Sequence, residues 1–170
     1  MQSEHLIVAC SSFPNIKKEL IQVGAMNQPL RVLLDTNGYD PFLNEEDLLR
    51  LLDAINAEKV LLYGFKVVRQ ELRNIPKNIR YEKQNFRILT LEVYDEIVQN
   101  HIYRLTPFIE NLANEYSDFY KGPHPKEKMR KDFLIVACAS IHRLDVLASN
   151  DYQTMLSNEA VKTYTKVNGK

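Results

Sequence analysis

Four acidic residues stand where a folded chain can bring carboxylates together: Asp35, Glu71, Asp132 and Asp151. Asp35 directly follows an apolar run, Asp151 follows a second run by a few residues, and Glu71 lies early in an expected helix. Asp132 stands where a buried helix is expected to begin, so the positive end of that helix would favour its carboxylate. Crowded carboxylates with no Lys or Arg beside them repel one another unless cations are bound. Ligands that are all oxygen indicate Mg²⁺ or Mn²⁺.

Taken singly, each acid also has a purely structural explanation. Aspartate is common in turns, as at Asp35 and Asp151, and at helix N-caps, as at Asp132. Glu71 would suit an exposed helical surface. The interpretation as a metal site therefore depends on all four acids meeting in one crevice.

The segments that would position these acids alternate between strand and helix. Short apolar or β-rich runs predict strands over residues 31–34, 60–63, 87–91, 146–148 and 161–167. Periodic runs predict helices over residues 44–56, from 67 to before Pro76, from 92 to 120 with a break at Pro107, and from 132 to 141. This alternation predicts an α/β fold, a three-layer α/β/α sandwich with a central, mainly parallel sheet. In such sheets the loops beyond the carboxyl ends of the strands converge on one crevice.

The length of 170 residues fits one domain with one substantial core. We assign residues 30–168 to this domain and residues 1–29 to an N-terminal extension. Residues 6–10 and 134–138 both read Leu-Ile-Val-Ala-Cys, but the sequences that follow them diverge, so the evidence for duplication is weak. We expect the extension to add a strand or helix at a sheet edge, or to lie at an oligomer contact such as that of a homodimer.

Composition limits the classes of function. Lys plus Arg and Asp plus Glu both number 22, so the formal charge is zero and a polyanion must be bound by a local patch. Cys10 and Cys138 each lie in an apolar run, which indicates buried free thiols and a reducing cytoplasm. The longest apolar run, from Phe133 to Ala139, is far below the ~18 residues of a membrane span, so we expect no membrane partner.

Four segments of the chain resemble motifs of the PIN-domain family. They are Leu34-Asp35-Thr36-Asn37, Val67-Val68-Arg69-Gln70-Glu71-Leu72, Asp132-Phe133-Leu134-Ile135-Val136-Ala137-Cys138-Ala139 and Leu147-Ala148-Ser149-Asn150-Asp151. Their order and spacing agree with the family, and the resemblance covers about residues 31–167. The N-terminal extension and the long section from 92 to 131 depart from the compact toxin-type members.

The resemblance implies a Mg²⁺- or Mn²⁺-dependent ribonuclease. In that family the four acids hold metal, and a polar Asn or Ser/Thr supports them, here Asn37 and Ser149. The implied partners are an RNA substrate and, in the toxin-type members, an antitoxin protein. Other members process ribosomal or transfer RNA, and nothing in these motifs separates the two roles.

Two basic runs lie beside the expected metal ligands and would hold a nucleic-acid backbone. One contains Arg69, Arg73, Lys77 and Arg80, and the other Lys121, Lys126, Lys128, Arg130 and Lys131. We assign substrate binding to Arg73, Lys126, Lys128 and Arg130, since phosphates are positioned by local Lys and Arg. An ordinary solvated surface is the alternative. Tyr116, Phe119 and Tyr120 offer stacking surfaces nearby, although aromatic residues at this spacing more often pack into a core.

Three other interpretations compete with a metal-dependent nuclease. Phosphatases of the haloacid-dehalogenase type need a second Asp two residues after the first, and that position is Asn37. His5, His101, His124 and His142 are scattered and form neither a zinc motif nor a catalytic triad. The remaining rival is a PIN-like module that binds RNA or protein without cleaving.

Overall fold

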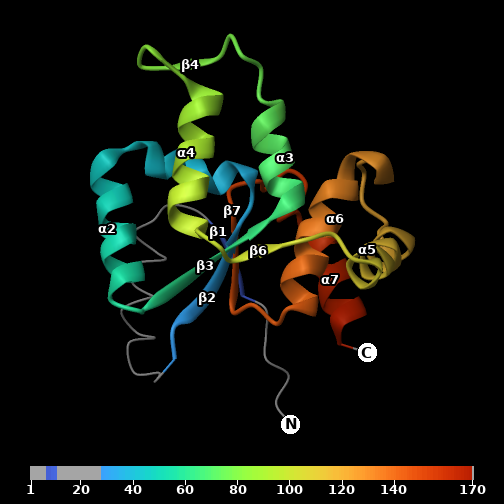
Figure 1. The fold of residues 1–170 in the computed structure, drawn as a ribbon. Helices are drawn as coiled ribbons and strands as arrows, with labels where there is room; N and C mark the ends of the chain where they lie inside the picture. The colour runs from blue at the N-terminus through green and yellow to red at the C-terminus, as the bar shows by residue number, and fades with distance from the viewer. Residues whose placement is uncertain (1–6, 11–27, 170) are drawn as a thin grey trace.

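A parallel sheet forms the centre of the molecule in the computed structural model, which describes residues 7–10 and 28–169. The strand order is β1-β7-β2-β3-β6, and every neighbouring pair is parallel. The strands are β1 (Ile7–Cys10), β2 (Leu30–Leu34), β3 (Val60–Phe65), β6 (Ile102–Tyr103) and β7 (Val146–Ser149). Figure 1 shows β2, β3 and β7 rising toward the same edge of the sheet, where each meets the loop or helix that follows.

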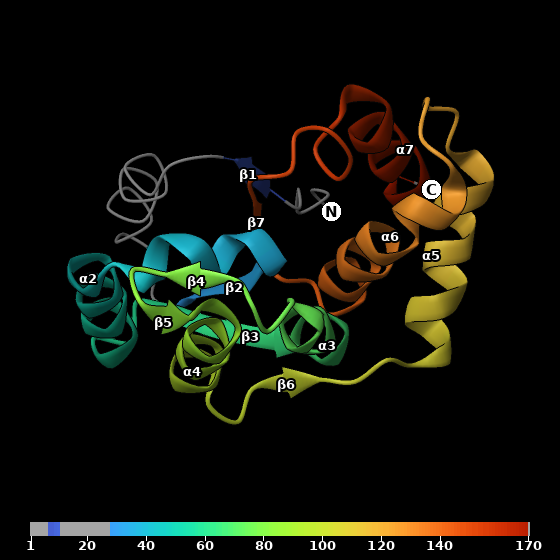
Figure 2. The ribbon, with the colours of Figure 1, turned by 90° about the horizontal axis from the view of Figure 1, so that it is seen from above.

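Helices cover both faces of this sheet. Seen from above in Figure 2, α2 and α4 lie on one side, and α6 with α5 and α7 on the other. Their bounds are α2 (Glu45–Asn56), α3 (Lys66–Asn74), α4 (Phe86–Val98), α5 (Pro107–Phe119), α6 (Lys126–Ile141) and α7 (Asn158–Asn168), with a 3₁₀ helix η1 (Thr36–Leu43) after β2. The expected three-layer α/β/α sandwich is confirmed.

Helix α6 is the central helix of its layer. All residues from Phe133 to Ala139 are buried, because α6 packs between the sheet and helix α5. Cys138 lies in this stretch as a free buried thiol, and burial raises its pKa to about 12. The expected free thiol is thus confirmed at Cys138, while the side chain of Cys10 lies outside the described residues.

Two predicted strands are wrong, because both segments are helical. Residues 87–91 belong to α4, whose N-cap Asn85 accepts a hydrogen bond from the Ile88 N–H. Residues 161–167 belong to α7, which Ser157 caps and which buries Ala160, Tyr164 and Val167 on one face. Short β-branched or apolar runs do not by themselves distinguish a strand from a buried helical face.

Two helix boundaries also differ from the prediction. The expected helix over 92–120 ends at Val98; strand β6 follows, and Pro107 begins α5 at its first position, where Thr106 is the cap. The helix expected to open at Asp132 begins at Lys126 instead. Residues 120–125, which include Pro123 and Pro125, separate α5 from α6.

An edge strand and one unexpected hairpin complete the fold. Residues 7–10 of the N-terminal extension form edge strand β1 beside β7, which confirms the added strand; residues 1–6 and 11–27 lie outside the described part. A short antiparallel hairpin, β4 (Arg80–Tyr81) and β5 (Gln84–Asn85), joins α3 to α4. None of the described helices is long and apolar enough to cross a membrane.

Candidate functional site

Four segments bring their acids to the carboxyl edge of the sheet. Asp35 follows β2, Asp151 follows β7, and Glu71 lies in α3, the helix that follows β3. Asp132 reaches the same place from α6. A pocket of about 400 Å³ opens there, lined by Glu71, Glu127, Lys128, Lys131, Asp132, Asp151, Gln153 and Thr154. We call Asp35, Glu71, Asp132 and Asp151 the acid cluster.

Asp35 is the buried member of the acid cluster, with 5% of its surface exposed. The backbone N–H of Thr36 donates to Oδ1 at 2.6 Å, and the Ser149 hydroxyl donates to Oδ2 at 2.7 Å. Burial raises the pKa of Asp35, these two hydrogen bonds lower it, and repulsion from Glu71 and Asp151 raises it further; the net shift is upward. Asp35 is thus held in place but stays close to other negative charges.

Glu71 is held from two sides. The Thr36 hydroxyl donates to Oε2 at 2.8 Å, and the Lys131 ammonium lies 2.8 Å from Oε1. The Lys131 side chain is 57% exposed, so this ion pair stands at the rim of the pocket. The charge of Glu71 is therefore offset by a lysine, so repulsion within the acid cluster is reduced there.

Asp132 is the least satisfied member of the acid cluster. Its Oδ2 atom is buried and has no hydrogen-bond partner among the described residues. Burial raises the pKa of Asp132 to about 7, a hydrogen bond from Thr154 opposes this rise, and repulsion from Asp35, Asp151 and Glu71 adds to it. Because α6 begins at Lys126, Asp132 lies beyond the first turn, and the expected stabilisation by the helix N-terminus does not apply.

Asp151 closes a tight turn. Its Oδ1 accepts hydrogen bonds from the backbone N–H groups of Gln153 and Thr154, and its Oδ2 accepts one from the Thr154 hydroxyl at 2.6 Å. Burial alone would raise the pKa of Asp151, but these bonds and the positive charge of Lys128 lower it overall. Asp151 is therefore ionised beside Asp132, the acid whose ionisation is least favoured.

The fit of the acid cluster to a metal ion is partial. Among the described residues, no three His, Cys, Asp or Glu side chains are placed together so as to hold a metal ion. Oxygens of Glu71 and Asp151 already contact Lys131 and Thr154, respectively. The unpartnered Oδ2 of Asp132 does fit a cation, because a buried carboxylate oxygen otherwise bears the full cost of its removal from water. A divalent ion on Glu71 would have to displace the Lys131 ammonium.

We compared the chain with protein-family models, with curated proteins and with solved structures. No match was found. The geometry of the acid cluster and the resemblance of the four sequence segments therefore carry the functional argument.

The supporting residues differ in part from those expected. Ser149 is buried and donates to Asp35, as its expected role requires, and it also accepts from the Asp151 N–H at 3.0 Å. Asn37 is exposed on η1, and its neighbour Thr36 makes the contact with Glu71. Sequence reasoning missed Thr36 and Thr154. The spacing of Asp151 and Thr154 is a signal for a side-chain-closed turn and would have indicated the second of them.

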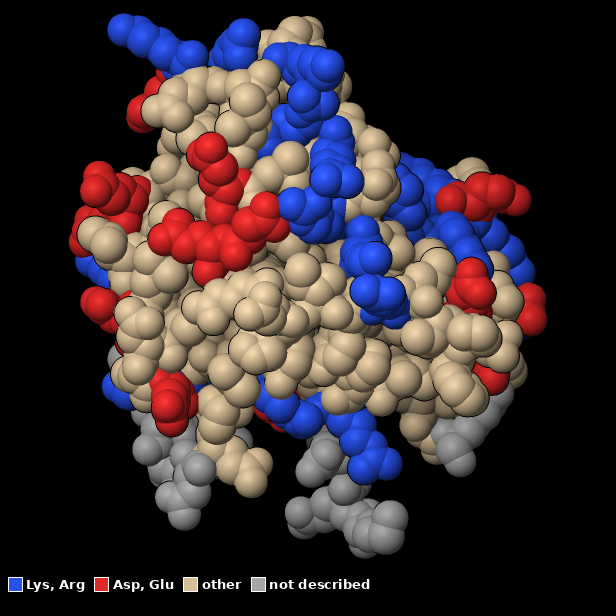
Figure 3. Space-filling view, in the orientation of Figure 1, with Lys and Arg blue, Asp and Glu red and all other residues tan. Residues whose placement is uncertain are grey.

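The expected substrate-binding residues differ in how they are placed relative to the pocket. Lys128 lines it, while Lys126 is exposed at the first position of α6. Arg130 points instead toward α5, where it donates to Asn114 Oδ1 at 2.6 Å. Arg73 is exposed near the end of α3. Figure 3 shows a continuous band of Lys and Arg side chains over the α3 side of the molecule, and more of them over the start of α6.

The aromatic and imidazole groups lie elsewhere. Tyr116 and Tyr120 are buried in the core, which supports packing over base stacking, and Phe119 lies under the Lys166 ammonium at 5.0 Å from its ring centre. None of the described histidines lines the pocket. His142, for example, stacks on Tyr103 with ring centres 3.6 Å apart.

Proposed function

We propose that this chain is a Mg²⁺- or Mn²⁺-dependent endoribonuclease of the PIN-like type, with the acid cluster as its active site. The observation that carries the proposal is the meeting of four acids from four separate segments. Glu71, Asp132 and Asp151 line the pocket, and the buried Asp35 lies close enough for its charge to act on Asp132, which keeps a buried oxygen without a partner. A stable fold gains nothing from such an arrangement, since it raises the pKa of Asp132 to about 7. Crowded carboxylates of this kind are typical of functional sites.

In this proposal the residues of the chain divide into ligands and supports. The acid cluster holds the cation, and the hydroxyls of Thr36, Ser149 and Thr154 orient three of its carboxylates by donating to them. When bound, the cation polarises the scissile phosphate and lowers the pKa of the attacking water. Lys128 stands at the pocket wall, where it meets the phosphates on either side of the cleaved bond.

Lys131 has two roles in this proposal. Without cation its ammonium offsets the charge of Glu71, which limits repulsion within the acid cluster. A bound cation would supply that charge instead, and Lys131, at the rim of the pocket, would then be able to bind a phosphate. Its largely exposed side chain leaves room for this movement.

A second candidate function is a PIN-like module that binds RNA or protein without cleaving. The observation that favours it is the Lys131–Glu71 ion pair, which supplies a positive charge within the acid cluster without any metal. If the protein cleaves RNA, its biological role is that of a toxin restrained by an antitoxin or of an RNA-processing nuclease. Both roles place it in the cytoplasm. A homodimer is compatible with both.

The test is cleavage of end-labelled single-stranded RNA by the purified full chain in Mn²⁺. We expect internal cuts that chelator abolishes, and a loss of more than about a hundredfold in Asp132→Asn. Asp53→Asn is the matched control, because Asp53 is exposed on α2, away from the pocket. RNA binding without cleavage by the parent protein would establish the second candidate instead.

A further inference from the structure

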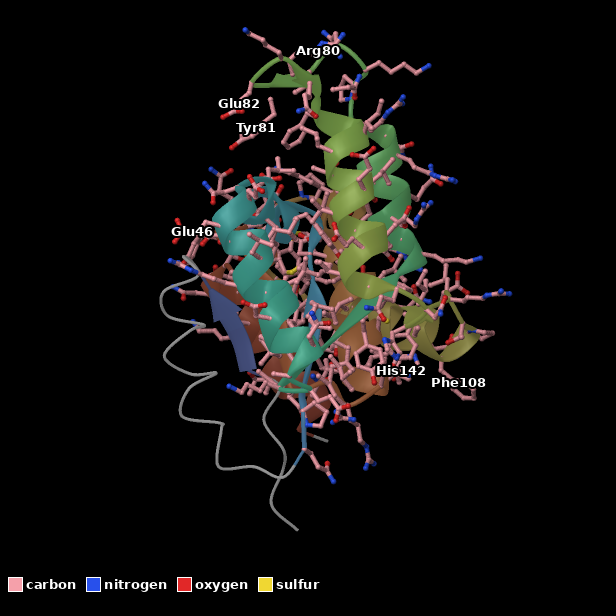
Figure 4. The ribbon with its side chains drawn as sticks, turned by 60° about the vertical axis from the view of Figure 1, so that its left-hand side comes forward. Glu46, Arg80, Tyr81, Glu82, Phe108 and His142 are labelled. Carbon is pink, nitrogen blue, oxygen red and sulfur yellow. The ribbon has the colours of Figure 1, made fainter. Side chains whose placement is uncertain are left out.

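The hairpin between α3 and α4 forms a small arm that stands clear of the body of the protein. We define the arm as residues 76–85, which contain β4 and β5. Every side chain from residue 76 to residue 84 is exposed. Figure 1 shows the arm above the carboxyl edge of the sheet, and Figure 4 shows Arg80, Tyr81 and Glu82 at its end, farthest from Phe108 and His142. Core burial therefore does not explain why this segment is folded.

Hydrogen bonds to the backbone give the arm its shape. Asn85 is central, since its Nδ2 donates to the Lys77 carbonyl at 2.8 Å while its Oδ1 caps α4. The Phe86 N–H donates to the Ile79 carbonyl at 3.1 Å, which closes the base of the hairpin. At the tip Glu82 adopts a left-handed conformation with φ 50°, which a non-glycine residue adopts at some cost. A local network through Asn85 and the backbone thus orders the arm without using the side chains of Lys77, Arg80, Tyr81 and Lys83.

The exposed side chains of the arm combine positive charge with an aromatic ring. Lys77, Arg80 and Lys83 outnumber the single acid, Glu82, and none of these three cations forms an ion pair within the described part of the chain. Tyr81 is 37% exposed between them. Unpaired nucleic acid is bound by this combination, because cations contact phosphates while an aromatic ring stacks on a base.

The position of the arm links it to the acid cluster. Seen from above, the arm lies over η1 and α4 on one side of the carboxyl edge, and α6 begins on the other side (Figure 2). Each side carries exposed cations, Arg80 and Lys83 on the arm and Lys126 and Lys128 on α6. The acid cluster lies at this same edge. A polyanion that crosses the edge would meet positive charge before and after the acids.

We propose that the arm is a second binding site for single-stranded RNA, which holds the part of the strand that extends beyond the acidic pocket. Tyr81 stacks on an unpaired base, and Lys77, Arg80 and Lys83 contact the phosphates beside it. The proposal rests on the proposed function for the identity of the polyanion, and it adds that the substrate is unpaired and longer than the pocket. A protein partner on the same surface is the alternative that the test must exclude.

The test is RNA binding by the full chain in the Asp132→Asn background, measured by fluorescence anisotropy. The probes are a single strand of about 12 nucleotides, one of about 4, and a duplex of the longer length. The arm variants are Tyr81→Ala, Tyr81→Phe and the double variant Arg80→Ala/Lys83→Ala. Phe108→Ala is the aromatic control, since Phe108 is 74% exposed at the other end of the molecule, and Lys59→Ala/Lys162→Ala is the charge control.

We expect Tyr81→Ala to weaken binding of the longer single strand about tenfold and to leave the short strand and the duplex unchanged. Tyr81→Phe should bind like the parent, because stacking does not need the hydroxyl. The double charge variant should weaken binding and reduce the slope of log K against log salt by about 0.7 for each phosphate that the protein no longer neutralises. Both controls should bind normally, and all melting temperatures should stay within about a degree because the arm lies outside the core.

The outcomes separate this proposal from the proposed function. Arm-dependent binding of the longer strand, with no Mn²⁺-dependent cleavage by the parent protein, would keep the arm site and reject the nuclease. Cleavage with equal binding by all arm variants would reject the arm site alone. The arm site would also be rejected if the arm variants weakened binding of the short and the long strand equally, or if Tyr81→Phe weakened binding as much as Tyr81→Ala. An arm that binds a protein and no RNA would reject it as well.

Discussion

Strands β2 and β7 carry charged residues at both of their ends, and the two ends behave in opposite ways. At the amino ends, Arg31 and Asp145 form a two-pronged pair, with nitrogen-to-oxygen distances of 3.2 and 3.0 Å, and the Arg31 N–H adds a third contact at 2.8 Å. The hydrogen bond to Asp145 is the main reason that the pKa of Arg31 is raised. At the carboxyl ends, Glu71 pairs with Lys131, and the other three acids form no ion pair within the described part of the chain.

The difference separates a charge arrangement that stabilises the fold from one that costs stability. The pair at the amino ends satisfies each charge and ties two strands together. The acid cluster leaves a buried oxygen of Asp132 without a partner and raises its pKa to about 7. Such an arrangement costs stability, and under the proposed function a bound cation would offset that cost, which is the usual relation between stability and function.

The largest expected effect is a change in melting temperature that has opposite signs in two substitutions. Without metal at pH 8, Asp132→Asn should raise the melting temperature by about 3–6 °C, because it removes a poorly solvated charge worth about 1–2 kcal/mol net. Asp145→Asn should lower it by a few degrees, since it weakens a pair that is partly exposed and worth about 1 kcal/mol. Calorimetry in chelator measures both. A decrease in both variants would show that Asp132 is a structural residue.

The dependence of stability on pH should follow from the same group. Asp132 has a folded-state pKa of about 7 against 3.8 for an ordinary carboxyl, so between these values the folded state binds a proton that the unfolded state does not. The free energy of unfolding should therefore rise as pH falls from 7 toward 4, and the burial-raised pKa of Asp35 acts in the same direction. Urea titrations across this range should show a smaller change in Asp132→Asn. Parallel curves for the two proteins would contradict this account.

Loss of a supporting hydroxyl should have a smaller effect. Ser149→Ala removes the hydrogen bond to the buried Asp35 carboxylate and the contact with the Asp151 N–H, so it should cost about 1 kcal/mol of stability. Ser117→Ala is the control, since Ser117 is half-buried on α5, away from the pocket. Equal unfolding midpoints in urea for Ser149→Ala and the parent would show that this hydroxyl does not hold Asp35.

The smallest expected effect concerns the competition between Lys131 and a cation. Lys131→Met removes the ammonium from Glu71, so Mn²⁺ should bind up to about fivefold more tightly, in keeping with the modest value of an exposed ion pair. Lys162→Met on α7 should bind Mn²⁺ like the parent. Electron paramagnetic resonance counts the free Mn²⁺ directly. Weaker binding in Lys131→Met would mean that Lys131 supports the metal site and does not compete with it.

The sequence indicated much of this site because strand ends are local signals. Asp35 directly follows an apolar run, and Asp151 follows another by two residues. Parallel strands place their carboxyl ends at one edge of the sheet, so these two acids come together there. The surroundings of Asp132 were harder to predict, since α6 begins at Lys126 after Pro125 with no side-chain cap to mark it. The Lys131–Glu71 pair joins two helices distant in sequence, and only the packing of α3 against α6 reveals it.

The elements of the fold also divide into those that local sequence signals predicted and those that depend on tertiary contacts. Strands β2, β3 and β7 and helix α2 have clear apolar runs or caps, such as Asn44 before α2, and were predicted. Residues 87–91 and 161–167 have compositions that suit a strand, but tertiary contacts bury one face of each as a helix. The arm between α3 and α4 buries none of the side chains from 76 to 84, so it leaves no hydrophobic pattern to detect.

The measurement that tests the central claim most directly is the effect of Mn²⁺ on thermal stability. Parent protein, Asp132→Asn and Asp145→Asn should be melted in chelator and again at about a hundredfold excess of Mn²⁺ over its dissociation constant for the parent. Parent and Asp145→Asn should each gain about 2.7 kcal/mol. Asp132→Asn should gain almost nothing, because the site loses the carboxylate whose oxygen has no other partner. An equal gain in all three proteins, or none in the parent, would contradict a cation site at the acid cluster.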